Sequence, residues 1–261
     1  MRTPKLEFDY LQMYFGEPYV IDLENTRGQI TVLQPKIGDI IRLGEDCFYS
    51  TLNIFITNTT SYRLPLWEMG RDWNELSDFD LFLMLYKTIN PEVSTLIFGD
   101  IDFLDFEYLP KYNDVGEVET VLYNSKLDIE LTKDVYNHIS QYLRNTFNIF
   151  PEEKFTKDPV LKKWYINKDK RQKAINEEKK AKGTEKNHSI QSIISACINH
   201  PGFKYKLQEL RNVGICEFYD SVQRLQIYEN STALMKGIYS GFVDTKKLNR
   251  EDMNFMKEFK R

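Results

Sequence analysis

The sequence predicts an α+β fold in which helices dominate, with a small N-terminal β-hairpin and a separate short antiparallel sheet near residues 96–131. Three observations support this prediction. Over most of the 261-residue chain, apolar residues recur three to four positions apart, which is the spacing of a helix with one buried face. Two regions alternate apolar and polar residues instead, as half-buried strands do. Strands and helices do not alternate throughout the chain, so a doubly wound α/β fold is not expected.

The hairpin is predicted in residues 19–35, after an aromatic-rich lead-in. Two alternating runs, 19–23 and 29–35, flank a short stretch of turn-forming residues that includes asparagine and glycine. Pro35 has no backbone N–H to give to a neighbouring strand, so it is expected to end the second strand.

Helices are predicted after the hairpin, between residues that cap or break them. A helical pattern covers 37–57 and is interrupted at Gly44, and a short helical turn is expected at 62–69. Ser77 is a suitable N-cap, with aspartates in the positive first turn, for a helix that Asn90–Pro91 ends.

Residues 96–131 alternate apolar and acidic residues, which predicts two or three antiparallel strands. The run 100–105 contains three aspartates but lacks the glycine and the closing glutamate of a calcium-binding EF-hand loop. Carboxylates on the wet face of a strand are therefore favoured there over a metal site.

The rest of the chain is predicted to be helical. Thr132 can cap a first helix, and Asp158–Pro159 is a strong start signal for a long second helix that stops near Gly183. Further helices are expected at 190–199, 204–211, 215–228, 232–240 and 250–259.

These elements divide the chain into four parts. The first, 1–95, holds the hairpin and the first helices, and 96–131 is an acidic β patch. The third, 132–186, consists of helices with a basic arm, and 187–261 is a C-terminal helical unit.

The basic arm, 160–186, contains ten Lys or Arg against four Asp or Glu in a chain whose net charge is -4. It could be a solvated helix, a docking face for an acidic partner, or a surface that follows the phosphates of nucleic acid. Only Trp164 and Tyr165 accompany the charges, and no stacking platform recurs. A solvated helix or a docking face for an acidic partner is therefore favoured, and the candidate partner-binding residues on it are Trp164, Tyr165, Lys170 and Arg171.

Two apolar clusters each have two interpretations. Trp67 and Trp73 could form a binding groove, but the apolar residues that follow them favour a core. Phe218, Val222 and Leu225 repeat along one helical face and must be buried either against the body or against a partner. All three are therefore candidate partner-binding residues, and 213–259 is expected to be a packed unit. Gly237 and Gly241 favour a helix that ends at Gly241 over a close helix contact.

No catalytic, metal or cofactor site is predicted, and the chain is not expected to be an enzyme. The histidines, His138, His188 and His200, have no metal-binding spacing, and no phosphate-binding glycine pattern occurs. Cys197 and His200 lie three residues apart, which places them close together by chance on a short helix.

The expected location is the cytoplasm of a cell. The acidic start excludes a secretory signal, no run is long enough for a membrane span, and three widely spaced cysteines suggest reduced thiols.

Three stretches, 30–50, 66–82 and 212–259, resemble tail-morphogenesis proteins of phages and prophages of Gram-positive bacteria. The resemblance rests on a strand that ends in Gln-Pro, a Trp-rich segment before a Ser-Asp helix start, and the helix EFYDSVQRLQ. It implies a tail or baseplate assembly protein, either an assembly chaperone or a structural component of the virion.

Its expected partners are other tail or baseplate proteins, with a homo-oligomer also open, and membranes and nucleic acid are not expected. Its location would be the host cytoplasm or the virion tail. The alternative function is that of a nucleic-acid-binding accessory protein that uses the basic helix 160–186.

Overall fold

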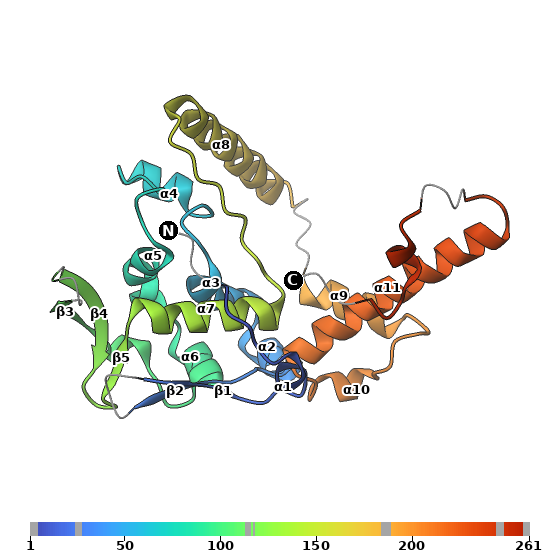
Figure 1. Ribbon diagram of the computed structural model, residues 1–261, viewed down its shortest axis with the longest axis horizontal. Coiled ribbons are helices and arrows are strands. Elements are labelled where there is room, and N and C mark those ends of the chain that lie inside the picture. The colour runs from blue at the N-terminus through green and yellow to red at the C-terminus, as the bar shows by residue number, and fades with distance from the viewer. Residues whose placement is uncertain are drawn as a thin grey trace.

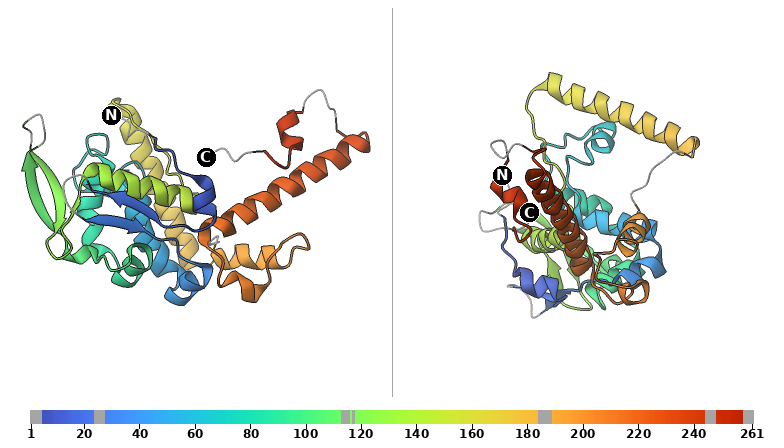
Figure 2. Two further views of the ribbon diagram at one scale, coloured as in Figure 1. Left: turned by 60° about the horizontal axis from the view of Figure 1, so that its bottom comes forward. Right: turned by 90° about the vertical axis from the view of Figure 1, so that its right-hand side faces the viewer.

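The computed structural model describes residues 5–23, 28–112, 116, 118–183, 189–243 and 248–257 (Figure 1). It has the predicted α+β architecture, in which a helical body carries a two-stranded hairpin and a three-stranded antiparallel sheet. Helix α7 crosses the middle of the body, the hairpin lies on one side of it, and the three-stranded sheet lies at one end (Figure 1). Helices α8 and α11 extend away from this body (Figures 1 and 2).

The predicted hairpin is confirmed. Strand β1 (Tyr19–Asp22) pairs antiparallel with β2 (Gln29–Val32), after a short helix α1 (Tyr10–Tyr14). Ile30 and Val32 are fully buried, so one face of the hairpin packs on the core. The predicted turn at 24–27 lies outside the described residues.

The first helices also form where the caps and breaks predict them. Gly44 separates α2 (Ile37–Leu43) from α3 (Glu45–Ile56), and its φ of 86° is a conformation that glycine adopts at little cost. The short helix α4 (Arg63–Glu68) and α5 (Asp78–Leu85) follow. The Ser77 hydroxyl accepts a hydrogen bond from the backbone N–H of Asp80, which is the predicted N-cap. Helix α5 continues as a 3₁₀ turn, η1 (Tyr86–Thr88).

The prediction of strands within 96–131 is wrong for its first part, up to residue 106. Helix α6 (Pro91–Phe98) and the 3₁₀ turn η2 (Phe103–Asp105) occupy this stretch. Asn90 ends the preceding turn and also caps α6, because its side chain accepts from the backbone N–H of Glu92 and Pro91 takes the first helical position. Asp102 in turn caps η2 through the N–H of Leu104, so this carboxylate serves a turn instead of the wet face of a strand.

The sheet begins later, at β3 (Glu107–Tyr112), and continues with β4 (Val118–Asn124) and β5 (Ile129–Leu131) in the order β3-β4-β5. Strands at 118–124 and 129–131 agree with the prediction. Helix α7 (Lys133–Phe147) follows β5 directly and is capped by Thr132, whose hydroxyl accepts from the N–H of Val135.

The main core lies between α7, α3, α5, α6 and the hairpin. Its largest fully buried side chains are mostly aromatic, and they include Phe48, Phe55, Phe82, Phe103, Tyr136 and Phe147. A second, smaller core of Leu64, Leu66, Trp73, Leu81 and Ile166 lies between α4, α5 and α8. Helix α5 contributes to both, since Phe79 and Phe82 belong to the first core and Leu81 to the second.

The C-terminal half contains α8 (Pro159–Ala181), α9 (Ile190–Ile198), α10 (Leu207–Leu210), α11 (Ile215–Tyr239) and the 3₁₀ turn η4 (Arg250–Met253). The two helices predicted at 215–228 and 232–240 are one continuous helix. The polar residues between them do not break it, and the Ser231 hydroxyl donates a 2.6 Å hydrogen bond to the Met253 carbonyl. The predictions at 204–211 and 250–259 shorten to α10 and η4, and residues 258–259 lie outside the described ranges.

Helix α11 is most deeply packed at its beginning and exposed at its end. Ile215, Cys216 and Phe218 are fully buried or nearly so, whereas Tyr239 is 81% exposed and Phe242 91% exposed. The end of the helix therefore extends out of the body, whereas the segment around Gly202 and the η4 turn pack along its middle (Figure 2). The expectation of a packed unit over 213–259 holds for its first part and is wrong for its end.

Gly237 and Gly241 lie at the C-terminal end of α11, and each has a structural role there. Gly241, at φ 75°, ends the helix as predicted. A Cβ added to Gly237 would lie 2.6 Å from the Val243 side chain, so Gly237 permits a close approach within this turn.

Candidate functional site: helix α8 and its cleft

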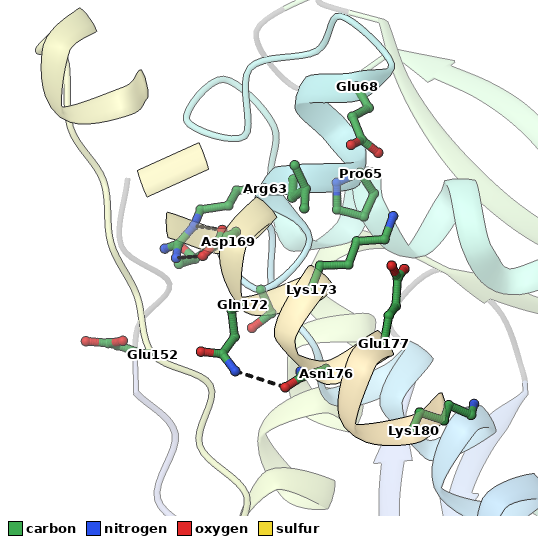
Figure 3. Close-up of a pocket in the computed structure, with 13 residues that line it drawn as sticks. Arg63, Pro65, Glu68, Glu152, Asp169, Gln172, Lys173, Asn176, Glu177 and Lys180 are labelled. Atoms are coloured by element: carbon green, nitrogen blue, oxygen red, sulfur yellow. Dashed lines mark hydrogen bonds and ion pairs between the residues drawn. The ribbon is translucent and has the colours of Figure 1, made fainter. Parts of the chain in front are cut away.

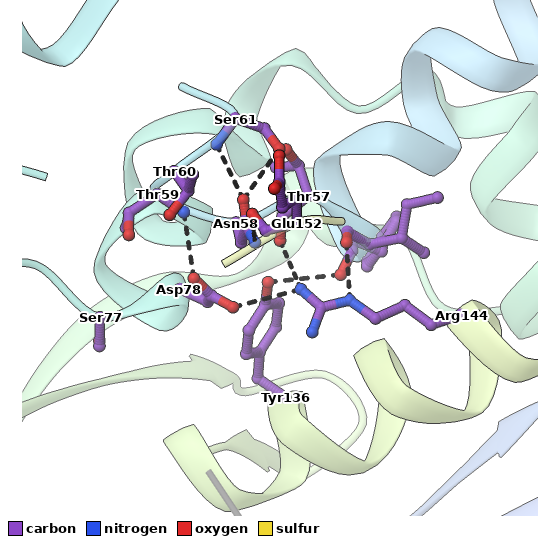
Figure 4. Close-up of polar contacts among 12 residues, drawn as sticks. Thr57, Asn58, Thr59, Thr60, Ser61, Ser77, Asp78, Tyr136, Arg144 and Glu152 are labelled. Carbon is purple, nitrogen blue, oxygen red and sulfur yellow. Dashed lines mark hydrogen bonds and ion pairs between the residues drawn. The ribbon is translucent and has the colours of Figure 1, made fainter. Parts of the chain in front are cut away.

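A polar junction fixes the base of α8 on the body (Figure 4). Thr57, Asn58, Thr59 and Thr60 are buried at the end of α3. The side-chain amide of Asn58 donates to the Glu152 carbonyl at 3.1 Å. The backbone N–H of Lys154 donates to the Thr60 hydroxyl at 3.0 Å, and the Trp73 indole N–H donates to the Lys154 carbonyl at 3.1 Å. Side chains therefore hold the connector 148–158, from which α8 emerges.

Arg144 joins three helix ends at this junction. Its Nε donates to the Ile56 carbonyl at 2.7 Å, and its Nη2 donates to the Thr57 carbonyl at 2.7 Å and to Asp78 at 3.2 Å. The other carboxylate oxygen of Asp78 accepts from the Thr59 N–H at 3.1 Å. Nearby, burial raises the pKa of Tyr136, whose hydroxyl donates to the Phe55 carbonyl. This arginine thus caps the end of α3 and ties it to α5 and α7.

The first turns of α8 are anchored to α4 and to the loop after it. Ile166 is 3% exposed and lies in the second core. Arg63 makes a two-pronged contact with Asp169, Nε to Oδ2 at 2.5 Å and Nη2 to Oδ1 at 2.6 Å, which raises the pKa of the guanidinium. The Lys162 ammonium also pairs with Asp72. Burial alone would raise the pKa of Asp72, but the hydrogen bonds from Lys162 and Asn74 outweigh it, so its pKa is lowered.

Beyond Asp169 the helix leaves the body. Every residue from 170 to 183 is exposed. A cleft of about 580 Å³ lies between this part of α8 and α4, lined by charged and amide side chains of both signs (Figure 3). Lys173, Glu177 and Lys180 line it from α8, and Glu68 and Pro65 lie on the α4 side. Such a lining suits polar groups of a partner.

The outer face of α8 carries a stripe of Trp164, Lys168, Arg171 and Ile175, which we call the outer stripe. Helical spacing places these four residues on one side. Trp164 is 54% exposed and Ile175 is 45% exposed, and the Lys168 ammonium lies 5.5 Å from the Trp164 ring centre. Two cationic groups therefore lie between two apolar ones, on a surface that suits an acidic partner with apolar contact points.

The residues predicted to bind partners fall into two separate groups. Trp164, Lys170 and Arg171 are exposed on α8, but Tyr165 packs into the second core beneath Arg63, whose guanidinium lies 5.0 Å from its ring. Three further candidates, Phe218, Val222 and Leu225, lie on α11.

Phe218 is fully buried and contacts the body of the chain itself. Val222 and Leu225 are half-buried, and Leu225 lines a second cleft of about 470 Å³ with Tyr14 and Tyr228. Sequence reasoning missed Lys168 and Ile175, although the spacing from Trp164 by four, seven and eleven residues contained the signal.

The aromatic pair before α5 divides between core and surface. Trp73 is fully buried, as the core interpretation predicts, whereas Trp67 is 36% exposed with its ring 6.2 Å from that of Trp73.

The described histidines make hydrogen bonds within the chain. His138 contacts the Tyr19 hydroxyl at 2.8 Å, and His200 accepts from the Gly202 N–H at 3.0 Å. Cys197 is buried and burial raises the pKa of its thiol, which disfavours the reactive thiolate. His188 lies outside the described residues. Within the described ranges, no group of three or more His, Cys, Asp or Glu could hold a metal ion, and no helix could span a membrane.

Comparison with known proteins adds one relationship. Residues 179–260, from the last turn of α8 through η4, match a family model described as the YomV second domain. The comparisons with curated proteins and with solved structures gave no match. The match covers less than half of the chain and points to a phage-related protein through this C-terminal region.

Proposed function

We propose that this phage-related chain is a tail or baseplate assembly protein that acts by binding other proteins, as an assembly chaperone or as a structural component of the virion. The proposal assigns no catalytic activity to the chain. The observation that carries it is α8, a 23-residue helix that is anchored over its first turns and exposed beyond them.

Helix α8 leaves apolar side chains exposed to water. Isolated helices are marginally stable, and most helices in proteins are stabilised by packing. Trp164 and Ile175 nevertheless remain about half exposed on the outer stripe. Exposed apolar surface costs about 25 cal/mol per Å², so a partner that covers the stripe gains this free energy. The family match supports a phage setting, although it begins at residue 179, after the outer stripe.

A capture experiment tests this function. The tagged full-length chain is added to an extract of phage-producing cells, and co-purified tail and baseplate proteins are identified by mass spectrometry. We expect Trp164→Ala/Ile175→Ala to reduce their recovery about tenfold or more, since a tryptophan that forms an interface hot spot costs about 2 kcal/mol or more when truncated. The matched control is Leu207→Ala, an apolar residue 58% exposed on α10, which should leave recovery unchanged.

The location of the protein then separates the two roles. A structural component stays in purified virions, whereas a chaperone is absent from them but binds tail proteins in the extract. Recovery of no tail protein, together with absence from virions, would refute the proposal. A mobility shift with DNA or RNA that weakens steeply with salt would favour the nucleic-acid alternative instead.

A further inference from the structure

An acidic groove lies on the other side of the molecule from α8. It has a volume of about 680 Å³ and lies between β1, the three-stranded sheet and the start of α7. Among the described residues that line it, four carboxylates face one lysine, Lys111. The four carboxylates are Asp22, Glu119, Glu130 and Asp134. We call the space that they line the acidic groove. Three of them are exposed, and Glu130 is buried.

Glu130 has one paired and one unpaired carboxylate oxygen within the described structure. Its side chain is 7% exposed, and one carboxylate oxygen binds the Lys111 ammonium at 2.5 Å. The other oxygen, Oε1, is buried and has no hydrogen-bond partner within the described structure. A buried carboxylate oxygen without a donor costs free energy. A lysine or arginine side chain that enters the groove would supply both the donor and the opposite charge.

The described part of α8 carries the matching charge. Residues 159–182 contain nine Lys or Arg and three Asp or Glu. Lys170 and Arg171 are exposed just beyond the last anchoring residue, Asp169. Figures 1 and 2 place α8 and the hairpin on opposite sides of the body, so the arm of one copy does not reach its own groove.

We infer that the acidic groove of one copy binds α8 of a second copy around Lys170 and Arg171. This inference rests on the proposed role of α8 as a protein-binding arm. The partner that occupies the acidic groove is a second copy of this chain. The contact is head to tail, because each copy donates an arm and accepts another through a different surface. Such heterologous contacts produce rings or open filaments.

Sedimentation velocity of the purified full-length chain tests the inference without any phage partner. We expect the mean mass to rise with protein concentration at about 20 mM salt. We expect self-association to weaken at least tenfold at about 500 mM salt, because the Debye length falls well below 10 Å there. A chain that stays monomeric at low salt across the concentration range would overturn the inference.

Two charge-reversed variants give the sharper test. Lys170→Glu/Arg171→Glu removes the arm and keeps the groove, whereas Asp22→Lys/Glu119→Lys removes the groove and keeps the arm. Each variant alone should be monomeric, with circular dichroism and melting temperature close to those of the unaltered chain. A mixture should form a one-to-one dimer and nothing larger, because only one working arm and one working groove remain.

The control is Arg42→Glu/Lys206→Glu, at two exposed cations away from both surfaces, which should self-associate normally. Self-association that persists in either reversed variant would overturn the inference. A mixture of the two variants that stays monomeric would also overturn the inference. If the arm variant alone then loses binding to DNA, the arm binds nucleic acid instead of the groove. Failure of the tail-protein capture would leave these measurements unaffected, so the two proposals fail separately.

Discussion

Replacement of Arg144 by methionine is expected to lower the free energy of unfolding by about 3 kcal/mol. Methionine keeps much of the aliphatic volume but donates no hydrogen bond. The carbonyls of Ile56 and Thr57 and one oxygen of Asp78 would each lose the donor that Arg144 supplies. Breaking a buried ion pair by removing one partner typically costs about 3–5 kcal/mol, and the lower end applies because the Arg144 side chain is 15% exposed.

Urea denaturation followed by circular dichroism measures this loss. The matched control is Arg42→Met, at an exposed arginine in the last turn of α2, where a change within about 0.5 kcal/mol is expected. Similar midpoints for the two variants would show that the polar junction is not what joins α3, α5 and α7.

The second large effect is expected for Trp73→Ala. Trp73 is fully buried in the second core, and its indole donates to the Lys154 carbonyl. Truncation of a buried tryptophan costs about 3–5 kcal/mol. Because this core is separate from the main one, the damage should concentrate on α4 and α8 and leave α7 intact.

Hydrogen exchange resolved by residue distinguishes local from global loss. Amides in the first turns of α8 should exchange faster by a factor of a hundred or more, which corresponds to about 3 kcal/mol or more of opening free energy, while those of α7 should change little. Trp73→Phe retains most of the apolar volume and should cost about 1–2 kcal/mol through the lost hydrogen bond. Equal acceleration in α7 and α8 would refute the separation of the two cores.

Elements with local end signals were predictable from the sequence. Ser77, Thr132 and Asp158 each bond to a backbone N–H two or three residues later, so the signal and its partner lie in the same short stretch. The prediction of strands within 96–131 failed up to residue 106 because alternating aspartates resemble the solvent-exposed face of a strand. In the structure the carboxylate of Asp102 caps a turn. Asn90 caps helix α6, but in the sequence Asn90–Pro91 is interpreted only as the end of the preceding helix.

Burial at the candidate site could not be predicted in the same way. The charge of α8 was visible in the sequence, but the part of it that is anchored depends on contacts between distant residues. Asp169 meets Arg63, which lies 106 positions away along the chain, and Tyr165 packs beneath the same arginine. Tyr165 and Trp164 are neighbours of similar character, and tertiary contacts alone make one an anchor and the other a surface residue.

The division between an anchored base and an exposed arm in α8 also has an evolutionary consequence. Substitutions between residues 170 and 183 touch neither core, and such surface changes typically alter stability by less than about 0.5 kcal/mol. Mutation there can therefore alter which partner is recognised while the fold stays above its stability threshold. In a lineage whose partners diverge quickly, this stretch is free to follow them, whereas Ile166, Asp169 and the connector 148–158 should change slowly.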